Sequence, residues 1–294
     1  MGGLSKRYGA LRAVRDVSFS VAEGEVFALL GPNGAGKTTT VEILEGFRSR
    51  DEGHVDVLGF DPADRATSRQ LRERLGIVLQ ELAVEPFLTV REVLTRTAGF
   101  YPDPRPVDEV IELVGLDEKA DARVKHLSGG QQRRLDVGLG IVGRPELIFL
   151  DEPTTGFDPA ARRGAWSLVR SLRGEGSTVV LTTHYMDEAE ELADRVAVIA
   201  GGRIVAQGDP ASLGSRREVH IRFRLPDGIT PDRLPVPAAV DGDRVSIETT
   251  DEVAVLHRLT GWALEGGVPL AGLTVERASL EDVYLQLTGP QAPA

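Results

Sequence analysis

Short, uninterrupted apolar runs recur along the first two-thirds of the chain, and each ends at a glycine-rich turn or a polar residue. Such continuous runs are typical of strands buried on both faces, as in a parallel α/β sheet. Open sheets of this kind place their ligands at the carboxyl ends of the strands, where these polar residues fall. The predicted strands are Val26–Leu30, Leu75–Leu79, Leu147–Leu150, Val179–Thr182 and Val196–Ile199.

The pattern changes between Pro86 and Arg144, where helical spacing replaces the strand runs. We predict a helical insertion between the strand that ends at Gln80 and the strand that ends at Asp151. Its predicted helices are Thr89–Phe100, Val107–Val114 and Gln131–Val142.

Beyond about Leu213 the pattern changes again and predicts a small α+β domain, so that residues 1–214 and 215–294 form separate domains. Apolar and polar residues alternate over Val219–Leu225, as in a half-buried strand. Arg224–Val245 is rich in Pro, Gly and Asp and is predicted to be a loop. The remaining predictions are a strand at Arg244–Thr249, a helix at Glu252–Leu264, a strand at Leu273–Val275, a helix capped by Ser279 with Asp282 and ending near Gly289, and a disordered tail Gly289–Ala294.

Composition narrows the functional classes. The net charge of −11 argues against nucleic acid as the main partner, since nucleic-acid binding needs a basic face. The absence of cysteine excludes disulfides and thiolate metal sites, and it fits a reducing compartment. No apolar run approaches the roughly 18 residues that span a bilayer, and the first residues lack the apolar stretch of a signal peptide. We therefore expect a soluble chain that reaches a membrane only through a partner.

A phosphate-binding loop is predicted at Gly31–Thr38, between the strand Val26–Leu30 and an apolar helix. Glycines at Gly31 and Gly36 let the backbone N–H groups point at phosphate oxygens, and the following helix N-terminus adds its dipole. Lys37 would reach the β and γ phosphates, and the Thr38 hydroxyl would hold Mg²⁺.

Residues at the ends of three other predicted strands complete a nucleotide site. Asp151 is expected to orient the water shell of Mg²⁺, and Glu152 to polarise the attacking water as general base. His184 follows a strand at a position from which it could contact the γ-phosphate, and Gln80 at another strand end could reach Mg²⁺ and the water. The other histidines are interpreted as structural: His54, His126, His220 and His257.

Leu127–Gln131 has the sequence LSGGQ and precedes a predicted helix. The Ser128 hydroxyl, the amides of Gly129 and Gly130 and a helix N-terminus would make a second anion site. The simpler interpretation is a serine N-cap. One ATP needs only one phosphate cradle, so a second cradle indicates a site that closes over the ATP of another copy.

In this order the motifs closely resemble the ATP-binding subunit of ABC transporters, over about Leu4 to Gly214. The resemblance implies a P-loop NTPase fold: a RecA-like α/β core, an antiparallel β-subdomain and a helical subdomain at about residues 84–144. It also implies a head-to-tail homodimer that binds two ATP with Mg²⁺. The C-terminal domain would have a regulatory or dimer-stabilising role, although a purely structural role is an equal alternative.

The same resemblance assigns the individual site residues. Tyr8 would stack on adenine, Asp158 would link the two sites, and residues 83–100 would face the groove for a coupling helix of the membrane subunit. Phosphates would be bound by Gly31, Asn33, Gly34, Gly36, Lys37, Thr38 and Thr39, and by Ser128, Gly129, Gly130 and Gln131 of the other copy. Thr38, Gln80 and Asp151 would hold Mg²⁺, and Glu152, His184 and Gln80 would act in catalysis.

Finer features resemble the drug-resistance branch of ABC exporters, similar to daunorubicin-resistance ATPases. They are Thr154–Pro159 and the ending Ala278–Gly289, and the excess of 30 Arg over 4 Lys fits a GC-rich bacterial genome. This implies a peripheral protein on the cytoplasmic face of the cell membrane, working with an integral membrane permease. An antibiotic is the expected cargo, with lipid or polysaccharide as the alternative.

Two other functional classes compete with the exporter interpretation. ABC ATPases that act on ribosomes usually carry two cassettes, and their DNA-repair relatives carry long coiled coils; the sequence shows one cassette and no heptad run. A regulatory ATP sensor is the third alternative.

Family members usually begin with a further strand ahead of the segment that matches Leu4–Tyr8. We therefore expect either a β-subdomain without an edge strand or a start codon assigned too late, and both affect how Tyr8 is anchored.

Overall fold

The computed structural model describes residues 1–78, 84–214, 219–226 and 228–277. It divides into two compact units, Met1–Pro210 and Ala211–Ala294, and each unit is described by itself. Three sequence predictions lie outside the described residues: Gln80, the capped helix after Ser279 and the tail Gly289–Ala294.

A mostly parallel sheet forms the centre of the first unit, as the apolar runs predict. Its order is β5-β6-β7-β3-β8-β9, and all pairs are parallel except the antiparallel edge pair of β8 and β9. Every residue of β3, β6 and β7 is buried, which explains why their sequences lack polar alternation. The strands are β5 (Leu75–Val78), β6 (Leu147–Asp151), β7 (Thr178–Thr183), β3 (Val26–Leu30), β8 (Arg195–Ala200) and β9 (Arg203–Gly208).

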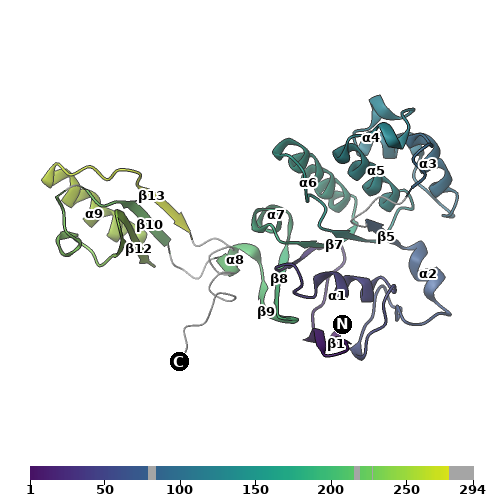
Figure 1. Ribbon diagram of the computed structural model, residues 1–294, viewed down its shortest axis with the longest axis horizontal. Helices are drawn as coiled ribbons and strands as arrows, with labels where there is room; N and C mark the ends of the chain where they lie inside the picture. Colours follow the sequence, from purple (N-terminus) through teal and green to yellow (C-terminus); the bar gives the residue numbers. More distant parts are fainter. Residues whose placement is uncertain (79–83, 215–218, 227, 278–294) are drawn as a thin grey trace. The chain divides into compact units, whose positions relative to one another are not determined.

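Helices follow the strands, and those of the predicted insertion form a group of their own. Figure 1 shows α3, α4 and α5 together beside the β5 end of the sheet, where α5 packs on β5. The close approach of α5 to β5 requires glycine at position 76, because a Cβ there would lie only 2.4 Å from Gly140 O. The helices are α1 (Lys37–Leu44), α2 (Ser68–Glu73), α3 (Val90–Ala98), α4 (Val107–Leu113), α5 (Gly129–Ile141), α6 (Pro159–Gly174), α7 (Met186–Leu192) and α8 (Pro210–Gly214), with 3₁₀ turns at Asp117–Lys119 and Val124–His126.

An antiparallel sheet of order β2-β1-β4 completes the first unit. The strands are β1 (Gly2–Tyr8), β2 (Leu11–Val17) and β4 (Glu52–His54). β1 is the middle strand and pairs on both sides, so the strand that ends at Tyr8 is firmly anchored. Its buried Leu4 joins the same apolar cluster as Phe27 and Phe149 of the parallel sheet. This shared core attaches the antiparallel sheet to the nucleotide-binding half of the fold.

The second unit is an α+β arrangement of a four-stranded sheet and a helix around its own core. The sheet has the order β11-β12-β10-β13, and α9 packs its buried Leu259 with Ile221 and Ile247 of the sheet. Its elements are β10 (Val219–Arg224), a 3₁₀ turn at Pro231–Arg233, β11 (Ala239–Asp241), β12 (Arg244–Thr249), α9 (Glu252–Gly266) and β13 (Thr274–Arg277).

The loop predicted over Arg224–Val245 is wrong in one part, because β11 lies within it. β11 pairs with β12 through a tight hairpin in which Asp241 lies opposite Arg244. The two residues of the turn are Gly242 and Asp243; a Gly-Asp pair between two strands is a hairpin signal, and here Gly242 adopts φ +60°. The surrounding prolines and glycines obscured that signal in the sequence.

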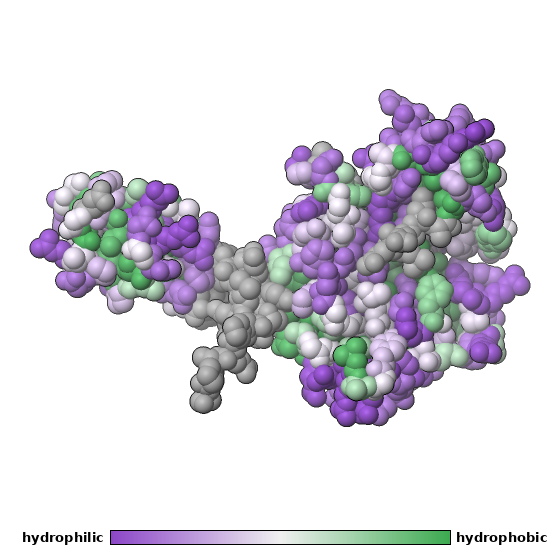
Figure 2. All heavy atoms as spheres, viewed as in Figure 1, coloured by the Kyte–Doolittle hydropathy of each residue, from purple (hydrophilic) through white to green (hydrophobic). Residues whose placement is uncertain are grey.

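One face of the molecule is mostly polar. Figure 2 shows a largely hydrophilic face on which apolar side chains form small, separate groups. Within the described ranges, no helix combines the length and the apolar character needed to cross a membrane.

Candidate functional site

The loop between β3 and α1 depends on glycine at both ends. A Cβ at Gly31 would lie 2.3 Å from Ile199 O, and a Cβ at Gly36 would lie 2.4 Å from Ala13 O. Gly36 also adopts φ +105°, a conformation that glycine reaches at no steric cost. It takes the N-cap position of α1 without a side-chain cap, so the first-turn N–H groups of α1 are presented to an anion.

Three polar side chains from different parts of the chain converge just beyond the strand ends. Lys37 Nζ lies 3.4 Å from Glu152 Oε1, and His184 Nδ1 lies 3.4 Å from the same oxygen. Lys37 Nζ also donates to Gly31 O at 2.7 Å, within the loop itself. His184 Nδ1 is buried and has no hydrogen-bond partner among the described residues. Lys37, Glu152 and His184 are therefore brought together, as the sequence predicts.

Glu152 is held in an unusual backbone conformation. Its φ is +47°, in the left-handed region that a side chain other than glycine adopts at a cost. Its N–H donates to both the carbonyl and the hydroxyl of Thr182, each at 3.1 Å. Thr155 Oγ1 donates to Glu152 Oε2 at 3.2 Å. These contacts fix the carboxylate beside the phosphate loop.

The electrostatics around Glu152 favour a charged carboxylate. Burial acts to raise its pKa, but the charges of Lys37 and His184 and the hydrogen bond from Thr155 outweigh burial and hold the pKa below its ordinary value. Glu152 is thus ionised near neutral pH and able to accept a proton.

The donors near Asp151 fit Mg²⁺. Asp151 is buried and accepts a hydrogen bond from Thr182 Oγ1, while Thr38 is exposed on the first turn of α1. In the described part of the chain, no group of three His, Asp or Glu side chains could by itself enclose a metal ion. A small number of protein ligands is enough for Mg²⁺, because this ion keeps several waters and also binds oxygens of substrate phosphates.

Leu127–Gln131 leads into α5, which begins at Gly129. Ser128 caps the helix: its Oγ accepts from Gln131 N–H at 3.3 Å, and Gln131 Oε1 accepts from Ser128 N–H at 2.9 Å. A Cβ added at Gly129 or Gly130 would meet nothing within 4 Å. The side chains of Ser128 and Gln131 each accept from the backbone N–H of the other residue, so the open face of this turn is made by the glycine backbone.

Several of the remaining predicted ligands are exposed. Asn33 and Gly34 are exposed in the phosphate loop, and Thr39 is half-buried in α1. Tyr8 is 38% exposed, with the guanidinium of Arg48 5.3 Å from its ring centre. Asp158 caps α6 by accepting from Ala161 N–H at 2.8 Å. Gln80 lies outside the described residues.

Two family models match the chain. The model described as "ABC transporter" covers residues 14–155, and "ABC transporter domain-containing protein-like, C-terminal domain" covers residues 219–279. Daunorubicin resistance ATP-binding protein DrrA3 of Streptomyces coeruleorubidus is 37% identical over 98% of this chain and 94% of its own length. The chain belongs to the ATP-binding family of ABC transporters. It is accordingly an ABC ATPase, and the predicted family is confirmed.

Other relatives and solved structures agree with this family. Nod factor export ATP-binding protein I of Rhizobium sp. (strain N33) is 40% identical over 98% of this chain and 96% of its own length. An ATP-binding subunit of an ABC transporter superposes with a TM-score of 0.66 at 26% identity, covering 72% of this chain and 90% of that one. The cassette MJ0796 in a post-hydrolysis state, at 24% identity and a TM-score of 0.64, covers 71% of this chain and 97% of its own and shares the fold. The predicted ABC cassette fold is therefore confirmed.

Several residues that shape the ATPase site are not among those predicted from the sequence. Thr182 binds both Asp151 and Glu152, and a threonine at the end of the strand next to β6 was the available signal. Arg133 donates to Asp151 O at 2.7 Å and pairs with Asp136 at 2.8 Å. Burial raises the pKa of Asp136 to about 6, although the charge of Arg133 acts to lower it. An Arg and an Asp three apart on one helix were visible in the sequence but were not distinguished from a surface pair.

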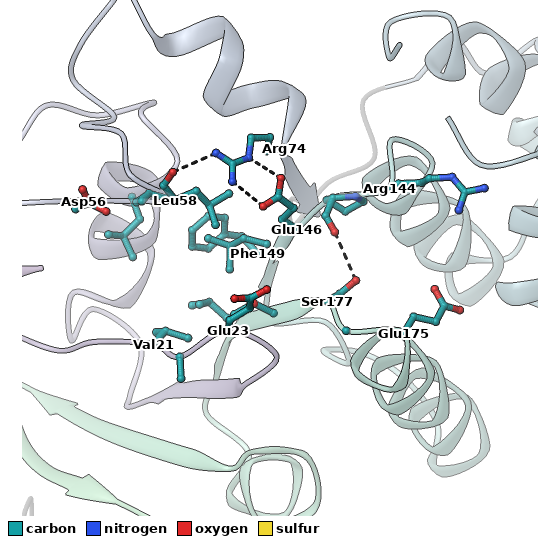
Figure 3. A pocket seen from close by; sticks show the side chains of 18 of the residues that line it. Val21, Glu23, Asp56, Leu58, Arg74, Arg144, Glu146, Phe149, Glu175 and Ser177 are labelled. Carbon is teal, nitrogen blue, oxygen red and sulfur yellow. Dashed lines mark hydrogen bonds and ion pairs between the residues drawn. The ribbon is translucent and has the colours of Figure 1, made fainter. Parts of the chain in front are cut away.

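A cavity of about 1010 Å³ lies away from this site, beside the first residues of β6 and β7 (Figure 3). Arg74 bridges its wall, donating to both Glu146 oxygens at 2.6 Å and to Leu58 O at 3.1 Å. None of the predicted ATP-site residues that the structure describes lines this cavity.

Proposed function

We propose that two copies of this ABC ATPase power the export of a drug-like molecule through a separate integral membrane permease. The two copies would bind the permease at the cytoplasmic face of the membrane. The observation that carries the ATP-hydrolysing part is the convergence of Lys37 and His184 on one oxygen of Glu152, each at 3.4 Å. This convergence supports the roles of Glu152 as base, Lys37 as phosphate-binding cation and His184 as a third polar group, beside an uncapped helix N-terminus.

In the proposed reaction, the loop Gly31–Gly36 and Lys37 bind the phosphates of ATP, with Tyr8 against the adenine. Glu152 accepts a proton from the water that attacks the γ-phosphate, and His184 orients the γ-phosphate. Thr38, Asp151 and Gln80 would hold Mg²⁺, which neutralises charge on the phosphates when bound. Because the pKa of Glu152 is held below its ordinary value, the base is available at neutral pH.

The glycines of α5 support a dimer. Gly129 and Gly130 have negative φ values and room for a Cβ, so neither backbone strain nor packing within the chain requires glycine there. Glycine in a helix costs about 0.5–1 kcal/mol relative to alanine. A requirement from outside the chain explains the cost: the phosphates of the partner copy's ATP approach this backbone. MJ0796, which shares the fold, is described as dimeric with ADP and Pi.

Export through a separate permease is supported by the relatives and by the surface. The similar proteins are named for daunorubicin resistance and for Nod factor export. Phe87 and Phe100 are 67% and 71% exposed in the segment expected to face the membrane subunit. Exposed aromatic side chains of this size are suited to docking an amphipathic helix.

Hydrolysis and dimerisation are tested together with Glu152→Gln. This variant should retain ATP binding, lose hydrolysis by about 10²–10⁴-fold, and accumulate a dimer on size-exclusion chromatography with ATP. Glu146→Gln, which alters a glutamate of the distant cavity, is the matched control and should behave like the unaltered protein. A Glu152→Gln protein that stays monomeric despite measured ATP binding would count against the proposal.

The membrane partner and cargo need separate experiments. Affinity purification from solubilised membranes should recover an integral membrane permease; recovery of ribosomes from the soluble fraction would contradict the exporter function. A drug-susceptibility panel on a deletion strain should show increased sensitivity to an exported compound. Unchanged sensitivity together with a lipid or polysaccharide defect would replace the drug cargo by the alternative cargo.

A further inference from the structure

Arg133 links the helix of Ser128–Gly130 to the strand end that carries Glu152. It lies one helical turn after Gly129 on α5, and its side chain is 11% exposed. Its Nη2 donates to Asp151 O at 2.7 Å and to Glu152 O at 3.5 Å, and its Nε donates to Pro153 O at 3.4 Å. One guanidinium therefore reaches the carbonyls of three consecutive residues, with Glu152 in the middle.

Asp136 fixes the direction of this guanidinium. Arg133 Nη1 donates to Asp136 Oδ2 at 2.8 Å, one turn further along α5, and the Asp136 side chain is 10% exposed. A planar guanidinium with one edge held by a carboxylate has its remaining N–H groups set in direction, a property that lysine lacks. The pair Arg133–Asp136 therefore projects fixed donors from the helix toward the strand end.

The contact matters because the backbone of Glu152 is strained. A φ of +47° persists only where the surroundings over-determine it. Thr182 holds the N–H of Glu152 from the β7 side, at 3.1 Å. Arg133 holds the carbonyls on both sides of Glu152 from the α5 side. The strained residue is clamped between a strand of the core and the helix whose first turn is Ser128–Gly130.

We propose that Arg133 is a positioning residue for ATP hydrolysis, which holds the backbone around Glu152 to the helix that serves the other copy's ATP. This inference rests on the proposed role of Glu152 as base. Arg133 touches no reacting atom, so its effect passes through Glu152: loss of the clamp leaves nucleotide binding in place but displaces the base. A displacement of about 1 Å in a catalytic group lowers a rate by as much as about 10²-fold.

The first test compares Arg133→Gln with Arg134→Gln in the full-length protein. Arg134 is the next residue of α5 and donates to Gly115 O at 3.3 Å, so its variant controls for charge loss on the same helix. Arg133→Gln should lower kcat by about tenfold to a hundredfold and change the KM for ATP by less than about twofold, while Arg134→Gln stays within about twofold of the unaltered protein. Equal losses in both variants, or a rise in KM that accounts for the loss, would overturn the proposal.

The decisive test combines Arg133→Gln with Glu152→Gln. If Arg133 acts through Glu152, the double variant hydrolyses ATP no more slowly than Glu152→Gln alone, because the group it positions is already gone. A general structural role would instead make the two losses multiply, and that result overturns the proposal. Should Glu152→Gln itself hydrolyse ATP at the unaltered rate, the proposed role of Glu152 fails, which is a distinguishable outcome.

If the Arg133→Gln protein does not fold, the Asp136→Asn variant takes its place in these tests. It keeps the shape of the side chain and removes only the charge that directs Arg133. It should lower kcat by about threefold to tenfold with unchanged KM, and it should also be silent in the Glu152→Gln background. A normal kcat in a folded Asp136→Asn protein would overturn the role assigned to the pair.

Discussion

Charged side chains are arranged differently at the two ends of the parallel sheet. Beside the first residues of β6 and β7, Arg74 pairs with Glu146, and the buried Arg105 pairs with Glu109 and Glu175 around a cavity of about 1010 Å³ (Figure 3). At the carboxyl ends, Lys37 and His184 share one oxygen of a single glutamate whose backbone is strained.

This difference shows that cavity size does not locate the chemistry of the ATPase. At the cavity, Arg74 and Arg105 pair with glutamates and link neighbouring elements. The polar groups around the Glu152 carboxylate are crowded together, and Thr182 and Arg133 hold its backbone. They lie beside a loop that needs glycine at both ends. A strained backbone, and a carboxylate that two basic side chains approach, are expected of a functional site when they lie at an edge of the sheet that a ligand can reach.

Replacing one cation at each end gives the largest expected contrast. Lys37→Ala should lower the rate of ATP hydrolysis by about 10³-fold, because it removes the charge that stabilises the phosphates. Arg74→Ala should leave kcat and KM within about twofold and cost at most about 1 kcal/mol of stability, since its ion pair with Glu146 is partly exposed. Steady-state ATPase rates and urea unfolding measure both effects. Similar loss of activity in the two variants would remove the distinction between the ends.

His184→Ala should have the next largest effect, on the pH dependence of hydrolysis. The charges of Lys37 and His184 hold the pKa of Glu152 below its ordinary value against the opposing effect of burial. Removing His184 therefore raises that pKa, and the acid limb of the kcat profile, where Glu152 gains a proton, moves to higher pH. The rate at pH 7 should fall by roughly tenfold to a hundredfold. A His257→Ala control in the second unit should keep the original profile; an unshifted acid limb in His184→Ala would contradict the shared charge.

Glu45→Gln should have a smaller effect, visible in stability. Burial raises the pKa of Glu45 to about 7, with the charges of Asp151 and Glu42 adding to it. The folded-state pKa lies above that of an unfolded glutamate, so the stabilisation by the bound proton is complete below about pH 4.5 and is lost as the pH rises through about 7. At pH 8 the Glu45→Gln protein should be more stable by up to about 3 kcal/mol, and the difference should vanish near pH 4. Urea unfolding at both pH values measures it, with the exposed Glu23→Gln as control.

The sequence predicted the elements whose signals are local. Uninterrupted apolar runs located β3, β6 and β7, and the glycine spacing located the phosphate loop. Contacts between distant segments were beyond this kind of prediction. The role of Thr182 depends on the pairing of β6 with β7, and the role of Arg133 depends on how α5 packs against the sheet. β11 was missed because its three residues lie among prolines and glycines, which outweighed the signal of the Gly-Asp turn.

The central claim is that Gly31–Lys37 of one copy and Ser128–Gly130 of another close over the same ATP. The chain contains no cysteine, so single cysteines can be introduced without background reaction. We would place Asn33→Cys in one Glu152→Gln protein and Ser128→Cys in another, and treat each protein and their mixture with a short bifunctional thiol crosslinker. The account predicts a product of twice the chain mass only in the mixture and only with ATP. Crosslinking within either variant alone, or none in the mixture despite measured ATP binding, would contradict it.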